Sequence, residues 1–159
     1  MSEDELEERL KHKQSVAGIS LQRLPPLYYA AVTFNSDLFL ALLATGVGVD
    51  VNWAQPDTGI SVLHFCAEND VPAELEAALN AGDDVKAVTL DRMAGRGDYV
   101  SGGLTPLHLA AARGKTASIA LLLRHGADAA ARDWCGRTPL IHALQWGHAA
   151  AAELLAPKA

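Results

Sequence analysis

The chain has 159 residues, of which 50% are apolar and 20% charged, and a formal net charge of −6. This charge argues against a general nucleic-acid surface, and the longest apolar run, residues 38–44, is far shorter than the roughly 20 residues that span a bilayer. The charged N-terminus lacks the apolar core of a secretory signal, and two cysteines are too few for a disulfide framework. We therefore expect a cytoplasmic protein, or a nuclear one, with no membrane association and no nucleic-acid partner.

Residues 1–23 are predicted to form a charged N-terminal extension. Ser2, followed by Glu5 three residues later, is typical of a capping box at the start of a helix. Leu6 and Leu10 give this helix one narrow apolar stripe. We expect the helix to cover the first unit of the domain behind it or to fray, and a role as a partner-binding arm stays open.

The segment from residue 24 to residue 155 contains one unit repeated four times. Thr105-Pro106-Leu107 recurs at Thr138-Pro139-Leu140, which is 138 − 105 = 33 residues later. Leu27, Leu63 and Leu107 occupy equivalent positions in the first three units and lie 36 and 44 residues apart. Both spacings exceed the 33-residue period, which indicates one insertion in each of these two intervals. The predicted units cover residues 24–57, 58–87, 102–133 and 134–155, with an insertion at 88–101 and a C-terminal tail at 156–159.

Each unit reads as two short helices. In the third unit, Thr105 and Pro106 are typical of a helix cap and first turn, and Gly114 of a helix end. A second helix is predicted from Thr116 to the glycine at position 126, with apolar residues spaced by three and four. A single helix pair cannot bury its own apolar face, so the four units are expected to stack.

These units resemble ankyrin repeats. The resemblance is carried mainly by GLTPLHLAAARGKTASIALLLRHGADAAARD (103–133) and GRTPLIHALQWGHAAAAELL (136–155), with weaker copies at 61–87 and 25–52. The chain departs from the family pattern at Phe34 and Asp70, which replace glycine, and at Ile141-His142, which replaces His-Leu. The resemblance implies an all-α ankyrin-repeat solenoid with short β-hairpin loops, and a degenerate first unit and alanine-rich last unit fit capping repeats with solvated outer faces.

The histidines and cysteines give no sign of catalysis or metal binding. The resemblance implies that His64 and His108 bond backbone groups of the connecting loops. His142 and His148 have no partner carboxylate or thiol at the spacing of metal ligands, and Cys66 and Cys135 are expected to be free thiols. No nucleophile motif or phosphate-binding loop is present, so we expect no enzyme activity, no catalytic residue, no metal and no cofactor.

The tryptophans are the strongest binding signal. Trp53 and Trp134 fall in loops, and Trp146 falls at the exposed end of a first helix, where ankyrin repeats contact their partners. Exposed tryptophan is enriched at binding hot spots. The predicted partner-binding residues are Trp53, Arg113, Trp134, Arg137, Gln145 and Trp146. In the alternative interpretation, Trp146 packs on the open end of the last unit and Trp53 packs under its own loop.

The insertion lies in the hairpin between the second and third units. Its Arg92, Arg96 and Tyr99 are predicted to contact a partner, because long loops in compact arrays are often functional. The tripeptide Arg96-Gly97-Asp98 would be an adhesion signal only outside cells.

Charge is unevenly distributed along the chain. Residues 24–85 contain nine acidic residues and no Lys or Arg, whereas residues 86–159 contain nine basic and five acidic residues, a net charge of +4. An elongated fold would keep the two halves apart, and separated charge steers partners.

The resemblance implies a non-catalytic protein–protein interaction module that acts through its concave face and hairpin loops. Within that class we expect a monomeric adaptor or regulatory subunit that binds a partner protein. A stoichiometric inhibitor of an enzyme such as a kinase is the alternative. A module belonging to a larger ankyrin protein is a third possibility, against which the predicted capping units argue.

Overall fold

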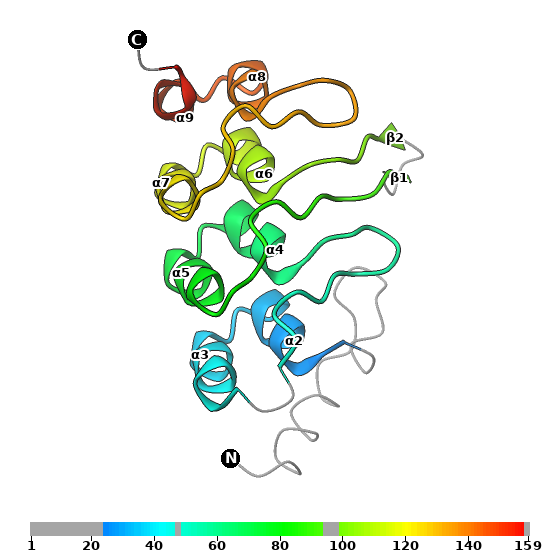
Figure 1. Ribbon diagram of the computed structural model, residues 1–159, viewed down its shortest axis with the longest axis vertical. Coiled ribbons are helices and arrows are strands. Elements are labelled where there is room, and N and C mark those ends of the chain that lie inside the picture. The colour runs from blue at the N-terminus through cyan, green and yellow to red at the C-terminus, as the bar shows by residue number, and fades with distance from the viewer. Residues whose placement is uncertain (1–23, 47–48, 94–98, 158–159) are drawn as a thin grey trace.

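The structure, a computed structural model, describes residues 24–46, 49–93 and 99–157. The helix expected within residues 1–23 and the predicted loop residue Arg96 lie outside these ranges. Eight helices in the described residues form four stacked pairs (Figure 1). The pairs are α2 (Pro26–Val32) with α3 (Ser36–Thr45), α4 (Val62–Asn69) with α5 (Pro72–Asn80), α6 (Pro106–Arg113) with α7 (Thr116–Arg124), and α8 (Pro139–Gln145) with α9 (Ala149–Leu155). The predicted all-α ankyrin solenoid is confirmed.

The helices begin and end where capping chemistry places them. The Thr105 hydroxyl accepts a hydrogen bond from the backbone N–H of His108, and Pro106 occupies the first turn of α6. Gly114 ends α6 in the left-handed conformation, with φ +68°. In the first two units Phe34 (φ 54°) and Asp70 (φ 58°) adopt this conformation in place of glycine.

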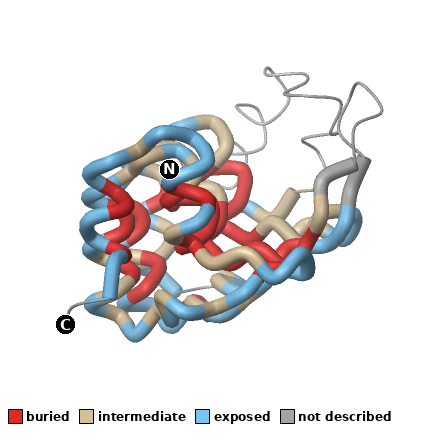
Figure 2. Tube along the Cα trace, turned by 90° about the horizontal axis from the view of Figure 1, so that it is seen from above, coloured by how far each residue is buried: buried red, intermediate tan, exposed pale blue. Residues whose placement is uncertain are grey.

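The helices form two rows with the apolar core between them. In Figure 1, α2, α4, α6 and α8 form an inner row beside the loops, and α3, α5, α7 and α9 form an outer row. Figure 2 shows buried residues between the rows and exposed residues around them. Leu63, Leu107, Ile119 and Leu122 are completely buried at the predicted apolar positions. No helix within the described ranges is long and apolar enough to cross a membrane.

The loops between units extend from the inner row and pair with one another. Leu90 N donates to Thr58 O at 2.8 Å, and Trp134 N donates to Gly102 O at 3.2 Å. The insertion ends in a short antiparallel ribbon of β1 (Arg92–Met93) and β2 (Tyr99–Val100), with Arg92 opposite Val100. The insertion therefore lengthens one hairpin without disturbing the stack of helices.

Two buried histidines join consecutive units. The Nε2 atom of His64 donates to Leu104 O at 2.9 Å, and that of His108 donates to Arg137 O at 2.9 Å. In each case Nδ1 accepts from the backbone N–H of the helix cap. The expected structural role of both histidines is therefore confirmed.

The outer face of the last unit is more apolar than a solvated capping repeat was expected to be. Leu144 is 62% exposed, and Ile141 and Leu154 are also exposed. The equivalent of Leu144 in the preceding unit, Ala111, is completely buried because α8 packs against α6. In the described residues no helix follows α9 to cover this face.

Candidate protein-binding surface

Trp146 is the most exposed tryptophan of the described chain. It caps the C-terminal end of α8 and is 68% exposed, and the adjacent Gln145 is also exposed. One unit earlier, Arg113 occupies the equivalent position at the end of α6. Because α6 and α8 pack side by side, these three side chains belong to neighbouring positions along the inner row of helices.

Arg113 is oriented by an acidic residue of the preceding unit. Its Nη2 and Nε atoms donate to Oε1 of Glu68 at 2.9 and 3.1 Å. The Arg113 side chain nevertheless remains 62% exposed. An ion pair this exposed contributes little to stability, so its main effect is to hold the guanidinium group along the inner row.

Trp134 lies in the loop that leads into α8 and is 56% exposed. Its indole ring packs directly on the backbone of Gly103, where an added Cβ would lie 2.3 Å from the ring. Gly103 has φ +78°, so both its conformation and this close approach require glycine. The ring is therefore held in place on one side and open to solvent on the other.

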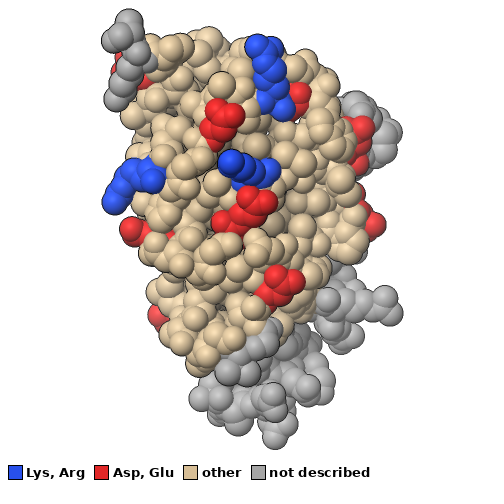
Figure 3. Space-filling view, viewed as in Figure 1, with Lys and Arg blue, Asp and Glu red and all other residues tan. Residues whose placement is uncertain are grey.

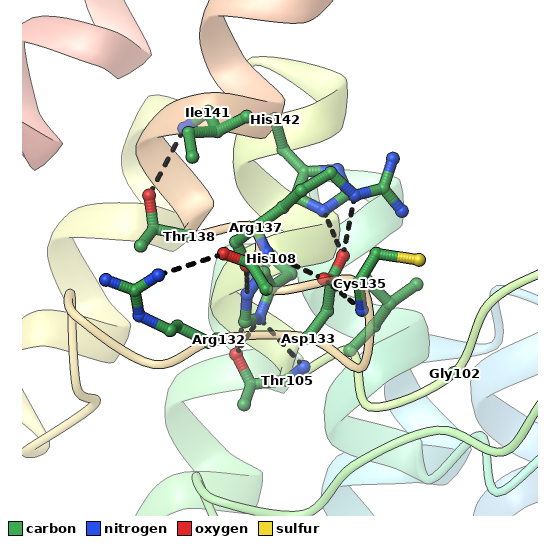
Figure 4. A network of polar contacts seen from close by, with 12 residues as sticks. Gly102, Thr105, His108, Arg132, Asp133, Cys135, Arg137, Thr138, Ile141 and His142 are labelled. Atoms are coloured by element: carbon green, nitrogen blue, oxygen red, sulfur yellow. Dashed lines mark hydrogen bonds and ion pairs between the residues drawn. The ribbon is translucent and has the colours of Figure 1, made fainter.

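Arg137 belongs to a polar network around the buried Asp133, shown in Figure 4. Nε of Arg137 donates to Oδ2 of Asp133 at 3.0 Å, and Nε2 of His142 donates to the same oxygen at 2.9 Å. The other oxygen of Asp133 accepts from the backbone N–H groups of Cys135 and Arg137. Four donors on one buried carboxylate fix the shape of this loop and leave the Arg137 side chain partly exposed.

The network shifts two pKa values. Burial alone would raise the pKa of Asp133, but hydrogen bonds from the Arg137 backbone and the His142 ring outweigh it and lower this pKa. Burial also lowers the pKa of His108, whose ring lies edge-on to that of His142 at 5.4 Å. The network therefore favours an ionised Asp133 beside a neutral His108.

Trp53 is separate from the other two tryptophans. It lies in the first unit, half-buried, with its ring edge-on to Tyr28 at a centroid distance of 4.8 Å. The sequence grouped Trp53 with Trp134 and Trp146, but the structure does not bring them together. The ring thus packs on helix α2 of the first unit.

The insertion residues are only partly described. Arg92 and Tyr99 lie on opposite strands of the β1–β2 ribbon, at the end of the longest loop. The ribbon lies at the tips of the loops, on the same side of the molecule as the inner row of helices (Figure 1).

Several exposed apolar residues were missed by the sequence analysis. Phe34 is 59% exposed and packs against Phe65 at a centroid distance of 5.6 Å. Its signal is present in the sequence, since a large side chain at a position where the family has glycine must stand at the end of a helix. Leu144 gave a weaker signal, a large residue where the preceding unit has Ala111.

The cysteines are free in the described structure, as expected, with Cys66 buried and Cys135 exposed. Among the residues described, no group of His, Cys, Asp and Glu side chains is arranged to hold a metal ion.

Charge is unevenly distributed along the long axis of the molecule. On the face shown in Figure 3, viewed as in Figure 1, the Lys and Arg side chains lie in the upper, C-terminal part, whereas acidic side chains occur along the whole described length. The basic and acidic segments of the chain are therefore only partly separated, and they meet in the Arg113–Glu68 ion pair.

Comparison with known proteins gives a consistent family match. The family model "Ankyrin repeats (3 copies)" matches residues 75–159, more than half of the chain. The chain is 36% identical to the nuclear factor NF-kappa-B p105 subunit of Gallus gallus over 122 residues, which is 75% of this chain and 11% of that protein. It is 33% identical to the B-cell lymphoma 3 protein homolog of Mus musculus over 124 residues, 77% of this chain and 25% of that protein.

A shorter match joins the chain to the E3 ubiquitin-protein ligase XBAT33 of Arabidopsis thaliana, with 50% identity over 48 residues. That match covers 30% of this chain and 9% of the ligase. The matches therefore cover only a small part, 9–25%, of the length of these relatives.

Proposed function

We propose that this chain, which belongs to the ankyrin-repeat family, is an adaptor or regulatory subunit that binds a partner protein through one surface of its third and fourth units. Ankyrin repeats are protein–protein interaction modules. The proposed surface, which we call the C-terminal surface, consists of Arg113, Trp134, Arg137, Gln145 and Trp146.

The exposure of Trp146 carries this proposal. A tryptophan that is 68% exposed leaves a large apolar area in water, and such side chains supply much of the energy at interfaces. It stands at the end of a helix in a stacked array, so little conformational entropy is lost when a partner covers it.

The neighbouring side chains are also arranged before binding. Trp134 rests on Gly103, and both arginines are held by carboxylates that leave part of each guanidinium group exposed. Tryptophan and arginine are the residue types most enriched at hot spots. A partner that offers an apolar segment flanked by acidic side chains would complement this surface.

A pull-down from lysate of the source cells tests the proposal, with Trp146→Ala as the main variant. Leu40→Ala is the matched control, because Leu40 is an exposed apolar residue on the outer helix α3. We expect a protein retained by the wild type and the control to be lost from Trp146→Ala, with melting temperatures nearly unchanged. Equal recovery from all three would overturn the proposal.

The alternative is a stoichiometric inhibitor of an enzyme such as a kinase. An inhibitor would lower the turnover of the captured partner at equimolar amounts, whereas an adaptor would leave that turnover unchanged. We expect a protein partner rather than nucleic acid, so binding should respond weakly to ionic strength, whereas phosphate contacts weaken steeply as salt rises.

A further inference from the structure

Phe34 exposes an aromatic ring in the turn that joins α2 to α3, where it is 59% exposed. Its φ of 54° lies in the left-handed region, which is unfavourable for a residue with a Cβ atom. The third and fourth units have Gly114 and Gly147 at this position. The backbone N–H of Phe34 donates to Ala31 O at 3.0 Å, so the turn closes through the backbone alone. The turn therefore gives no reason for phenylalanine, since glycine would form it without strain.

The ring of Phe34 packs against Phe65, a partly buried residue of α4. The ring centroids are 5.6 Å apart and the ring planes are inclined at 52°. These residues, which we call the phenylalanine pair, join the first unit to the second at neighbouring helices of the inner row. Phe65 therefore supports the ring of Phe34, and more than half of Phe34 remains exposed for contact with another molecule.

The charge near the phenylalanine pair is negative. Asp37 lies in the first turn of α3, and Asp70 occupies the equivalent helix end one unit later; both are exposed. Glu68 of α4 is already paired with Arg113. Residues 24–85 contain nine acidic residues and no Lys or Arg. A cation carried by another molecule would therefore be attracted to this end of the inner row.

We propose that the phenylalanine pair binds an arginine side chain of a protein partner, with the guanidinium group stacked on the ring of Phe34. The face of an aromatic ring attracts a cation, and arginine makes such contacts more often than lysine. A planar guanidinium group can stack on the ring while its N–H groups remain free to bond carboxylates or water. The negative charge favours this group over a wholly apolar or an acidic side chain. The inference rests on the proposed function only in taking a protein as the partner, because the C-terminal surface belongs to the third and fourth units.

Labelling the phenylalanine rings with ¹³C gives a direct readout in the full chain. The sequence contains three phenylalanines, and Phe39 is completely buried, so its ring serves as an internal reference. N-acetyl-arginine methylamide is titrated at low salt, with N-acetyl-citrulline methylamide as the uncharged probe of matching shape. We expect the arginine probe to shift the ring signals of Phe34 and Phe65, and the citrulline probe to leave them nearly unchanged. Equal shifts with both probes, or no shift at Phe34, would overturn the proposal.

Two variants separate the aromatic face from apolar contact. Phe34→Leu keeps an apolar side chain on the same backbone, and Phe34→Tyr keeps the ring. Followed through the ring signals of Phe65, Phe34→Leu should weaken binding of the arginine probe about two- to fivefold, the effect of losing an exposed cation–π contact. Phe34→Tyr should bind as the wild type does, and so should Leu40→Ala, which removes an exposed apolar side chain from the outer helix of the same unit. Unchanged affinity in Phe34→Leu would overturn the proposal.

The contribution of charge is measured by a second pair of variants. Asp70→Asn should weaken binding of the arginine probe about twofold, the effect of removing one exposed charge next to the site. Asp128→Asn makes the same change in net charge at an exposed position of the third unit and should leave the affinity unchanged. Equal affinities in these two variants would contradict the assigned role of the negative charge.

The two proposals fail independently. Trp146→Ala should bind the arginine probe as the wild type does, since Trp146 belongs to the fourth unit and the phenylalanine pair to the first two. Loss of partner capture in Trp146→Ala tests the C-terminal surface alone, and the probe titration tests the phenylalanine pair alone.

Discussion

The Nε2 atom of His142 lies 2.9 Å from Oδ2 of Asp133, which bonds helix α8 to the loop immediately before it. This histidine occupies a position at which the ankyrin pattern has leucine. A polar side chain here is satisfied only because Asp133 is buried beside it and ionised. The fourth unit therefore depends on a buried ion-pair network at a place where the third unit uses Leu109.

Replacement of Asp133 by alanine should lower the free energy of unfolding by about 3–5 kcal/mol, because four donors lose their acceptor in a buried site. Urea denaturation followed by circular dichroism measures the change. The matched control is Asp128→Ala, an exposed residue that accepts only a local backbone N–H, with an expected loss below about 1 kcal/mol. Similar losses in the two variants would contradict the role assigned to the network.

Asp83 should make stability fall as pH rises toward neutrality. Its pKa in the folded chain is about 7, above the ordinary value of roughly 4 in the unfolded chain. The stabilisation from protonated Asp83 is therefore complete below about pH 4 and is lost as pH rises through about 7. Urea denaturation between pH 4.5 and 7.5 should show a larger decline for the wild type than for Asp83→Asn.

The comparison between variant and wild type isolates this effect. His108, whose pKa is lowered, acts in the opposite direction, since its stabilisation is present above its ordinary value and is lost as pH falls. Both proteins contain His108, so its contribution cancels in the difference. Parallel pH profiles for Asp83→Asn and the wild type would show that Asp83 ionises normally.

The left-handed helix ends give a paired test of backbone conformation. Asp70→Gly should raise the free energy of unfolding by up to about 1 kcal/mol, because Asp70 has φ 58° and is exposed. At the equivalent position, Gly114→Ala should be destabilising, since the added Cβ would lie 2.6 Å from Nδ1 of His148. Thermal denaturation of both variants measures the two shifts, and shifts of the same sign would contradict this explanation.

The two thiols should differ sharply in reactivity. Cys135 is exposed in a loop, whereas Cys66 is completely buried in α4 and burial raises the pKa of its thiol. At pH 8 a disulfide reagent should therefore modify one thiol rapidly and the second only in denaturant. Cys135→Ser should abolish the rapid phase; a rapid phase that survives in this variant would place Cys66 within reach of solvent.

The helices were predictable because their signals are local. Thr105, Pro106 and Gly114 mark the ends of α6 by their own hydrogen-bonding and conformational preferences, and the 33-residue period transfers this interpretation to α8. The first unit resembles the others least, yet α2 and α3 form the same pair, because stacking against α4 and α5 compensates for weaker local signals.

The details of the binding surface depended on contacts between residues far apart in the sequence. Arg113 and Glu68 are 45 positions apart, and Trp134 meets the backbone of Gly103, so neither partner follows from a local pattern. The half-buried position of Trp53 likewise depends on Tyr28 in helix α2, 25 residues earlier in the chain. Residue type predicted which side chains are candidates, but only the packing of units separates the exposed tryptophans from the half-buried one.

The histidines that join consecutive units also determine how the array comes apart. His64 connects the second unit to the loop of the third, and His108 connects the third to the fourth. A unit that detaches at either boundary leaves a buried imidazole without its acceptor, which raises the free energy of the opened state. On the timescale of hydrogen exchange, opening at these two boundaries should therefore be rare, and the second, third and fourth units should open together rather than one at a time.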